Sequence, residues 1–214
     1  MSTGELQVVN TTEAYVNQLE ALQRIVFPTL TDEELFTAAK YRKHMELFPE
    51  GQFTALIEEE SGPVVVGATS TYRTDFDFDH IQHTFLDAVA HGWLTNHDPN
   101  GAWLYGVDVS VHPGYRRRGI GSALYAARYE LVQRLNLRGE IAGGMLPGYD
   151  RYRQKMSIEE YVERCAKGEI VGMTLTMQVR NGFRPVGILY DHLTDPRSDN
   201  CAALIVRKNP DFRP

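Results

Sequence analysis

The chain has 214 residues, of which 43% are hydrophobic and 23% are charged, and its formal net charge is −6. These values are typical of a soluble globular protein, and the negative charge argues against a nucleic-acid partner, because such binding depends on neutralising phosphates. The sequence has no apolar run of membrane-spanning length and no signal-peptide core at its start, so we expect no membrane partner. Two widely separated cysteines, Cys165 and Cys201, indicate reduced thiols in a cytoplasmic protein.

The first third of the chain alternates between strand and helix patterns. A short strand over residues 6–9 precedes a helix that Thr11 or Thr12 can cap. A second helix is predicted over residues 31–47, because the threonine at its start is followed three residues later by Glu34, a capping-box pattern. Two further strands, at residues 53–58 and 64–72, are predicted to form an antiparallel hairpin around Ser61-Gly62-Pro63.

A long connection over residues 75–101 follows, with a short helix predicted at 84–90 and many acidic and histidine side chains. Long ordered insertions often carry function. A metal site could be imagined from His80 and His83, but their spacing matches no known ligand pattern, and we expect no metal. Two interpretations stay open: a wall of an acceptor pocket whose carboxylates attract a cationic amine, or a solvated acidic loop. The carboxylates concerned are Asp75, Asp77, Asp79, Asp87 and Asp98.

The most informative stretch is residues 104–137, which predicts a strand, a basic loop and a helix in succession. Val107, Val109 and Val111 alternate with polar residues in the period of a strand, and His112-Pro113-Gly114 ends it. Three arginines at 116–118 then precede Gly119 and Gly121, and a helical stripe begins at Ile120. The first amides of a helix lack intrahelical acceptors, and glycines let a ligand approach them. With the arginines, this unit predicts a phosphate or pyrophosphate site, the alternative being a solvated basic loop.

The spacing of this loop excludes the P-loop and lacks the third small residue of the dinucleotide fingerprint. It resembles motif A of the GNAT superfamily of acetyl-CoA-dependent N-acyltransferases. That pattern is Arg/Gln-x-x-Gly-x-Gly/Ala after a strand ending in Val-x-Pro, and here it reads Arg116-Arg117-Arg118-Gly119-Ile120-Gly121 after Val111-His112-Pro113. A nucleotide-phosphate binder unrelated to coenzyme A remains a third interpretation of the same loop.

The last third of the chain again mixes strands and helices. A strand is predicted at residues 140–144, where Gly143-Gly144 can mark the splaying of two central strands. Ser157 and Glu160 form a second capping box, and Gly168 suits the end of that helix. The remaining predicted elements are a helix at 174–181, ended by Gly182-Phe183, and two closing strands at 186–190 and 202–206.

The resemblance to GNAT proteins extends over nearly the whole chain. It implies an α+β fold with a mixed, mostly antiparallel sheet of about seven strands, flanked by helices and carrying two insertions, in a single GNAT domain over residues 1–214. Three stretches resemble the GNAT domain that some bacterial proteins carry ahead of a carbon–nitrogen hydrolase. They are Asn96-His97-Asp98-Pro99, Leu146-Pro147-Gly148-Tyr149 and 156–163, and since the chain ends at Pro214 we expect no hydrolase domain.

The resemblance also implies acetyl-CoA as co-substrate, held between the splayed strands, and direct attack by an amine. The residues expected to bind it are Val109, Ser110, Val111, Arg116, Arg117, Arg118, Gly119, Ile120, Gly121 and Ser122. For proton transfer we single out Asp108 and His112, against the alternatives of a core carboxylate and a turn residue. The family's usual acid, a helix tyrosine, is replaced here by Gln178, and Tyr149 is a substitute unless it is merely packed.

Two functions follow from these expectations. The first is an N-acetyltransferase that acts on the primary amine of a small molecule or a peptide. The second is a non-catalytic acyl-CoA-binding sensor or accessory module, which the missing tyrosine favours. The sequence leaves the oligomeric state open, with a homodimer as one option.

Overall fold

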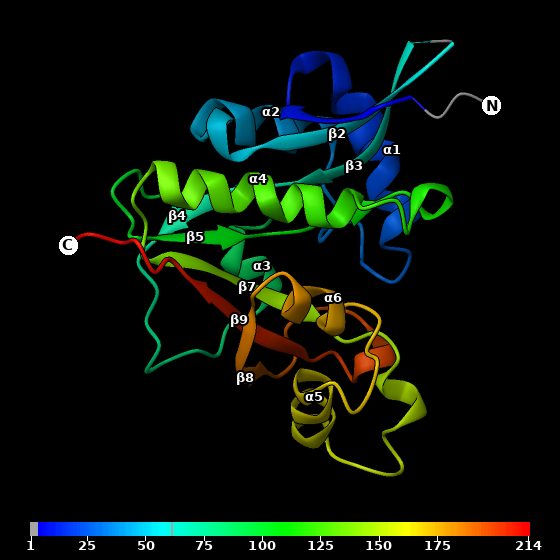
Figure 1. The fold of residues 1–214 in the computed structure, drawn as a ribbon, viewed down its shortest axis with the longest axis vertical. Coiled ribbons are helices and arrows are strands. Elements are labelled where there is room, and N and C mark those ends of the chain that lie inside the picture. Colours follow the sequence, from blue (N-terminus) through cyan, green and yellow to red (C-terminus); the bar gives the residue numbers. More distant parts are fainter. Residues whose placement is uncertain (1–3, 61) are drawn as a thin grey trace.

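A computed structural model describes residues 4–60 and 62–214, and Figure 1 shows their arrangement. Two sheets lie side by side, with the strand orders β1-β2-β3-β6 and β4-β5-β7-β9-β8. The strands are β1 (Leu6–Asn10), β2 (Phe53–Glu59), β3 (Gly62–Thr69), β4 (Thr71–Thr74), β5 (Trp103–Gly106), β6 (Ser110–Val111), β7 (Gly139–Met145), β8 (Arg184–Leu189) and β9 (Ala202–Lys208). All neighbouring strands are antiparallel except β5 and β7.

The nine strands are the seven predicted ones with two of them divided. The predicted strand 64–72 is broken into β3 and β4, and the predicted strand at 104–111 into β5 and β6. In both cases the first piece pairs in one sheet and the second in the other. The predicted hairpin is confirmed by the β2–β3 pairing from Phe53↔Thr69 to Glu59↔Gly62, although Ser61 lies outside the described residues.

Helices cover both faces of the strands. They are α1 (Val16–Val26), α2 (Ala38–Leu47), α3 (Phe85–Ala88), α4 (Ile120–Arg134), α5 (Ile158–Lys167) and α6 (Leu175–Arg180). Figure 1 shows α4 running across the front of the strands while α1 and α2 lie behind them. The side chains agree, because Ile120 and Leu124 of α4 pack with Ala55 and Val66, whereas α1 packs with the opposite-facing neighbours of those strand residues.

The second helix begins later than the sequence predicts. Thr31 and Glu34 do form their reciprocal capping bonds, at 2.8 and 3.4 Å, but the chain there makes only turns. The other carboxylate oxygen of Glu34 accepts a 2.8 Å bond from the Thr194 amide, which ties this segment to the β8–β9 connection. The helix starts only at Ala38, where Thr37 accepts from the Lys40 amide. By contrast, the box at Ser157 caps α5 as predicted.

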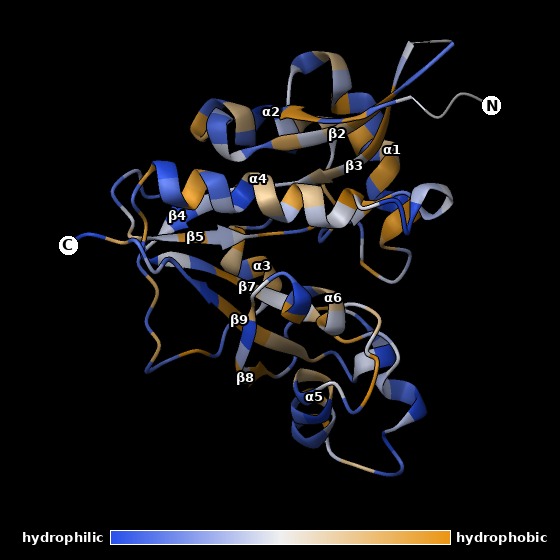
Figure 2. Ribbon diagram, in the orientation of Figure 1, coloured by the Kyte–Doolittle hydropathy of each residue, from blue (hydrophilic) through white to orange (hydrophobic). Residues whose placement is uncertain are grey.

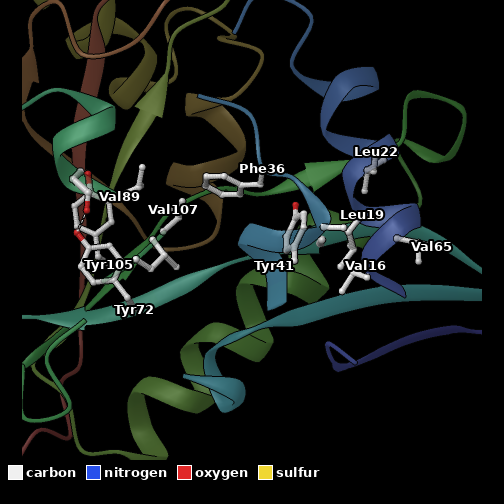
Figure 3. Packing of buried hydrophobic residues seen from close by; sticks show 14 of the residues in the cluster. Val16, Leu19, Leu22, Phe36, Tyr41, Val65, Tyr72, Val89, Tyr105 and Val107 are labelled. Atoms are coloured by element: carbon white, nitrogen blue, oxygen red, sulfur yellow. Dashed lines mark hydrogen bonds between the residues drawn. The ribbon is translucent and has the colours of Figure 1, made fainter. Parts of the chain in front are cut away.

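A large apolar cluster joins α1 and α2 to the strands, and Figure 3 shows part of it. Tyr72 and Tyr105 stack with ring centroids 5.1 Å apart, and Tyr72 donates to the Ala88 carbonyl at 2.6 Å. A second cluster lies under α5 and α6, and a third under α4. In Figure 2 the loop that leads into α4 is hydrophilic, as its exposed arginines require.

The long connection between β4 and β5 is fastened to β8, the last strand of its sheet. The amide of Gln82 donates to the Ile188 carbonyl at 2.8 Å and accepts from the Tyr190 amide at 3.1 Å. One side chain thus pairs with the outer backbone edge of β8 much as a neighbouring strand would. Within the described residues, no helix combines the length and the apolar character needed to cross a membrane.

Candidate functional site

The divided strand separates two neighbours that begin as a pair. β5 runs parallel to β7 through three registered pairs, the last being Tyr105↔Ile141. The chain then leaves β7, and Ser110 and Val111 of β6 pair with β3 instead. The facing edges of β6 and β7 therefore part after Tyr105, as Gly143-Gly144 predicted. We call this place, bounded by residues 106–111 and 142–145, the strand parting.

The loop entering α4 holds backbone amides free for an anion. Gly119 adopts the left-handed conformation, with φ of 81°, and a Cβ placed on it would meet nothing within 4 Å. Arg117 is also left-handed, with φ of 64°. Ala123 donates to the Gly119 carbonyl, but within residues 4–60 and 62–214 the amides of 117–122 have no backbone or side-chain acceptor. Together with the helix dipole, these amides form a site for a phosphate group.

The three arginines of this loop are all exposed. The Arg118 guanidinium lies over the Tyr115 ring, 5.2 Å from its centroid, and Tyr115 in turn donates to Glu59 at 2.6 Å. Within the described part of the chain, the Arg116 side chain makes one long bond, of 3.4 Å, to the Val111 carbonyl. Their charge is therefore little used within the chain and is available to a bound anion.

The first turn of α4 touches α6. A Cβ placed on Gly121 would lie 3.0 Å from Met177 Sδ, and the Asn181 amide donates to Ser122 Oγ at 3.4 Å. The glycine is therefore needed for the close approach of the two helices as well as for access to the amides. Val109 is half-buried and packs against the clusters under α4 and under α6, so it lies between the loop and the strand parting.

Asp108 sits at the strand parting and is held by three hydrogen bonds. It accepts from the Ser70 amide at 2.8 Å, from Gln23 Nε2 at 2.8 Å and from Ser110 Oγ at 2.9 Å. Burial raises the pKa of this carboxyl, although the hydrogen bonds oppose the shift. The structure thus brings Asp108 and Ser110 together, and α1 supplies the glutamine that fixes them.

His112 and Tyr149, the other residues predicted for proton transfer, have local partners. His112 Nδ1 accepts from the Gly114 amide at 3.2 Å and so caps the short helical turn Pro113–Tyr115. The Tyr149 hydroxyl donates to the Met156 carbonyl at 3.2 Å, and its ring packs on Tyr161 in the cluster under α6. In the described part of the chain, no hydrogen bond joins Asp108 to either of them.

The two glycines of β7 admit a polar side chain from each face of the sheet. A Cβ on Gly143 would collide with His192 Nε2, and one on Gly144 would lie 2.6 Å from Gln178 Oε1. His192 Nδ1 donates to the His83 carbonyl at 2.9 Å, so its Nε2 carries the lone pair, and burial lowers the pKa of this histidine to about 4. The glycine pair was the only sequence signal for His192.

A buried charge cluster lies beside the strand parting. Glu140 pairs with Arg128 at 3.0 Å and also with Arg207, and both Glu140 and Arg128 are almost completely buried. The Arg128 guanidinium fills the space above Gly106, where any side chain would collide with it. The opposite charges in this cluster stabilise one another, because an unpaired buried charge is very unfavourable.

Four of the five predicted carboxylates of the connection over residues 75–101 accept hydrogen bonds from the connection itself or from residue 102: Asp75, Asp77, Asp87 and Asp98. Asp77 accepts from the Asp79 amide at 2.9 Å and pairs with His80 at 2.7 Å, while Asp87 accepts from its capping residue Thr84 at 2.7 Å. Both ring nitrogens of His83 have partners, the Tyr105 hydroxyl at 2.9 Å and the Ile81 carbonyl at 2.7 Å. Apolar residues of this connection pack into the core: Phe76, Ile81, Phe85, Ala88, Val89 and Leu94.

Comparison with known proteins assigns the family. Residues 17–144 match the profile of the Acetyltransferase (GNAT) family. The chain belongs to the GNAT family. This membership supports acyltransferase activity in general, and the motif resemblance at residues 111–121 is confirmed at the family level.

Two proteins from Bacillus subtilis (strain 168) are similar in sequence to nearly the whole chain. It is 36% identical over 211 residues to the probable hydrolase YhcX, covering 98% of the chain but only 40% of that relative's length. It is 33% identical over 205 residues to the uncharacterized N-acetyltransferase YkwB, covering 95% of the chain and 89% of YkwB.

Solved structures agree with the GNAT fold. The loading GNATL domain of CurA from Lyngbya majuscula superimposes with a TM-score of 0.79 at 17% identity, over 96% of this chain and 98% of that one. The GphF GNAT-like decarboxylase, solved with isobutyryl-CoA, gives 0.71 at 21% identity, over 94% of this chain and 98% of that one. At these identities the likeness concerns the fold.

Proposed function

We propose that this single GNAT domain transfers an acetyl group from acetyl-CoA to the primary amine of a small molecule or a peptide. The observation that carries the proposal is the row of amides at 117–122, which have no acceptor among the described residues and lie on the loop that follows β6 and the strand parting. The open space at Gly119 and the free arginines fit a diphosphate. Acetyl-CoA would supply the activated thioester; every other role below belongs to the chain.

The amides of 117–122 would bind the diphosphate, with Arg116, Arg117 and Arg118 adding charge. Ser110 and Val111 pair with β3 through one edge of their backbone only. The other edge of 109–111 would pair with the pantetheine arm as an added strand does. An amide of this stretch, directed at the thioester carbonyl, would stabilise the oxyanion that forms when the amine attacks.

For the proton that the amine loses, we propose Asp108. Its carboxyl lies at the strand parting, and the raised pKa of this group makes it a better proton acceptor than a solvated carboxylate. His112 remains a second candidate for this role, and Tyr149 one for protonating the thiolate. Asp108→Asn and His112→Gln compare the two candidate bases, and Tyr149→Phe tests the candidate acid. A residue that transfers the proton should lower kcat by 10²-fold or more when replaced, because positioned proton transfer contributes about two to four orders of magnitude.

The test is thiol release from acetyl-CoA in the presence of polyamines, amino acids, aminoglycosides and peptides with free N-termini. Release that depends on the amine, with the acetylated product seen by mass spectrometry, supports transfer.

A second candidate, the non-catalytic acyl-CoA-binding module, is favoured by Gln178 in place of a tyrosine. Coenzyme A binding in calorimetry without thiol release from any amine would establish it. Because one structural neighbour is a decarboxylase, a carboxyacyl-CoA is included as substrate and the loss of CO₂ is followed.

A further inference from the structure

Gln178 points a polar atom at the strand parting. The side chain is only 4% exposed, and its Oε1 is completely buried without a hydrogen-bond partner among the described residues. That oxygen lies 2.6 Å from the place where a Cβ of Gly144 would be, beyond the last β5–β7 pair. If the amide is turned over, its nitrogen takes this place instead, so in either orientation one polar atom is left for something that enters between the strands.

The other end of the same amide reaches a tyrosine from a different helix. Gln178 Nε2 lies 3.4 Å from the Tyr125 hydroxyl, and Tyr125 belongs to α4, one turn beyond Gly121. The ring is 2% exposed and packs edge-on against Phe183, with centroids 5.3 Å apart. In the described residues the hydroxyl proton has no acceptor unless the amide is turned over. The Tyr125 hydroxyl thus lies next to Gln178, the position at which the resemblance to GNAT proteins leads one to expect a tyrosine.

Burial raises the pKa of the Tyr125 hydroxyl, and the charges of Arg128 and Arg207 oppose this rise. The Arg128 guanidinium lies 5.2 Å from the Tyr125 ring centroid and covers Gly106, where the strands part. The Arg207 guanidinium donates to the Tyr125 carbonyl at 2.8 Å, and Glu140 pairs with both arginines. These three groups carry a net single positive charge on the side of the sheet covered by α4 and α6.

We propose that the Tyr125 hydroxyl, positioned by Gln178, donates the proton that the leaving thiolate of coenzyme A takes up. This inference rests on the proposed acetyl transfer. In that step the amine nitrogen bonds to the acyl carbon, and the carbon–sulfur bond breaks with its electron pair going to sulfur. Sulfur takes the phenolic proton, and the phenolate regains one from solvent, which balances the proton that the amine has lost. Tyr149, whose hydroxyl is bound to Met156, is then not needed.

The first test is kinetic. Tyr125→Phe should lower kcat with acetyl-CoA by about 10²-fold while leaving KM within about threefold, because a proton donor acts only as the bond breaks. The loss should shrink towards unity with an acetyl thioester of an acidic aryl thiol, which leaves without protonation. The double variant Tyr125→Phe/Gln178→Tyr should recover part of the rate. Tyr129→Phe is the matched control, since it removes an exposed hydroxyl from the same helix; it should leave kcat unchanged.

The second test needs no acetyl transfer. The thiol pKa of bound coenzyme A is read from the pH dependence of its alkylation by iodoacetamide, with the alkylated coenzyme quantified by mass spectrometry. A hydrogen bond from Tyr125 stabilises the thiolate, so Tyr125→Phe should raise this pKa and Tyr129→Phe should not. An unchanged thiol pKa in Tyr125→Phe, or an equal loss with both thioesters, would overturn the proposal. A wild-type protein that acetylates no amine refutes the proposed function, whereas the thiol pKa still decides whether Tyr125 contacts sulfur.

Discussion

Replacing Gly121 by aspartate tests the anion site most directly. The glycine is in the first turn of α4, and its Cβ position lies 3.0 Å from Met177 Sδ and 3.9 Å from Val111 Cγ2. An aspartate there would place a carboxylate beside the free amides of 117–122. It would repel a bound diphosphate and would also compete with it for these amides.

The size of the effect follows from the charges. Two unit charges about 4 Å apart interact by about 4 kcal/mol at an effective dielectric constant of about 20, and each 1.4 kcal/mol is about tenfold in affinity. We therefore expect Gly121→Asp to weaken coenzyme A binding by about two to three orders of magnitude. The crowding of Met177 contributes less, since the far end of a methionine side chain can move.

Isothermal titration calorimetry with coenzyme A measures this loss, and two variants separate its causes. Gly121→Asn has nearly the same shape without the charge, and Gly121→Ala adds only the methyl group. We expect Gly121→Ala to weaken binding by less than about tenfold. Gly121→Asn should have an affinity between those of the alanine and aspartate variants. Equal affinities for Gly121→Asp and Gly121→Asn would show that the diphosphate does not lie at this turn.

Three further predictions concern stability. Glu140→Gln should lower the free energy of unfolding by about 3–5 kcal/mol, because it removes the charge that pairs with the buried Arg128 and with Arg207. Glu160→Gln, in an exposed pair, should lower it by less than about 1 kcal/mol in the same urea titration. Burial lowers the pKa of His44 from 6.5 to about 4, so the folded protein binds fewer protons than the unfolded chain in that window. The contribution of His44 to stability should be fully present above about pH 6.5 and should be lost as the pH falls, which lowers the free energy of unfolding by about 3 kcal/mol at pH 4. A His44→Gln variant with the wild-type pH profile would contradict this. Finally, Thr37→Ala should lower the free energy of unfolding by about 1 kcal/mol, because Thr37 is the residue that caps α2. Thr31→Ala should affect only the turn that Thr31 stabilises, and not the start of α2.

The sequence predicted the order of the elements well because local signals specify most of them. Ser157 and Gly168 delimit α5 as expected, and the glycine and arginine pattern placed the start of α4 within a residue of Ile120. The prediction of a helix from Thr31 was wrong for a tertiary reason. Glu34 is also the acceptor for Thr194, a contact 160 residues away that no local pattern could reveal.

The anion loop was predictable and the rest of the site was not. Amides at a helix start are a property of a few consecutive residues, whereas His192 and Tyr125 reach the strand parting through folding alone. Gly143 and Gly144 signalled that something approaches β7 closely, but not which side chain does so. The roles of Asp108, His112 and Tyr149 stay predictions, with their hydrogen bonds now known.

The Gln82 contact with β8 has a consequence for how the protein behaves when concentrated. An outermost strand offers bare peptide groups to any other chain, which is how stacked aggregates begin. Here the side chain of Gln82, from a connection far away in the sequence, forms hydrogen bonds with the Ile188 carbonyl and the Tyr190 amide and so covers this edge. Shortening that connection would therefore uncover the outer edge of β8 and make the protein more prone to aggregate.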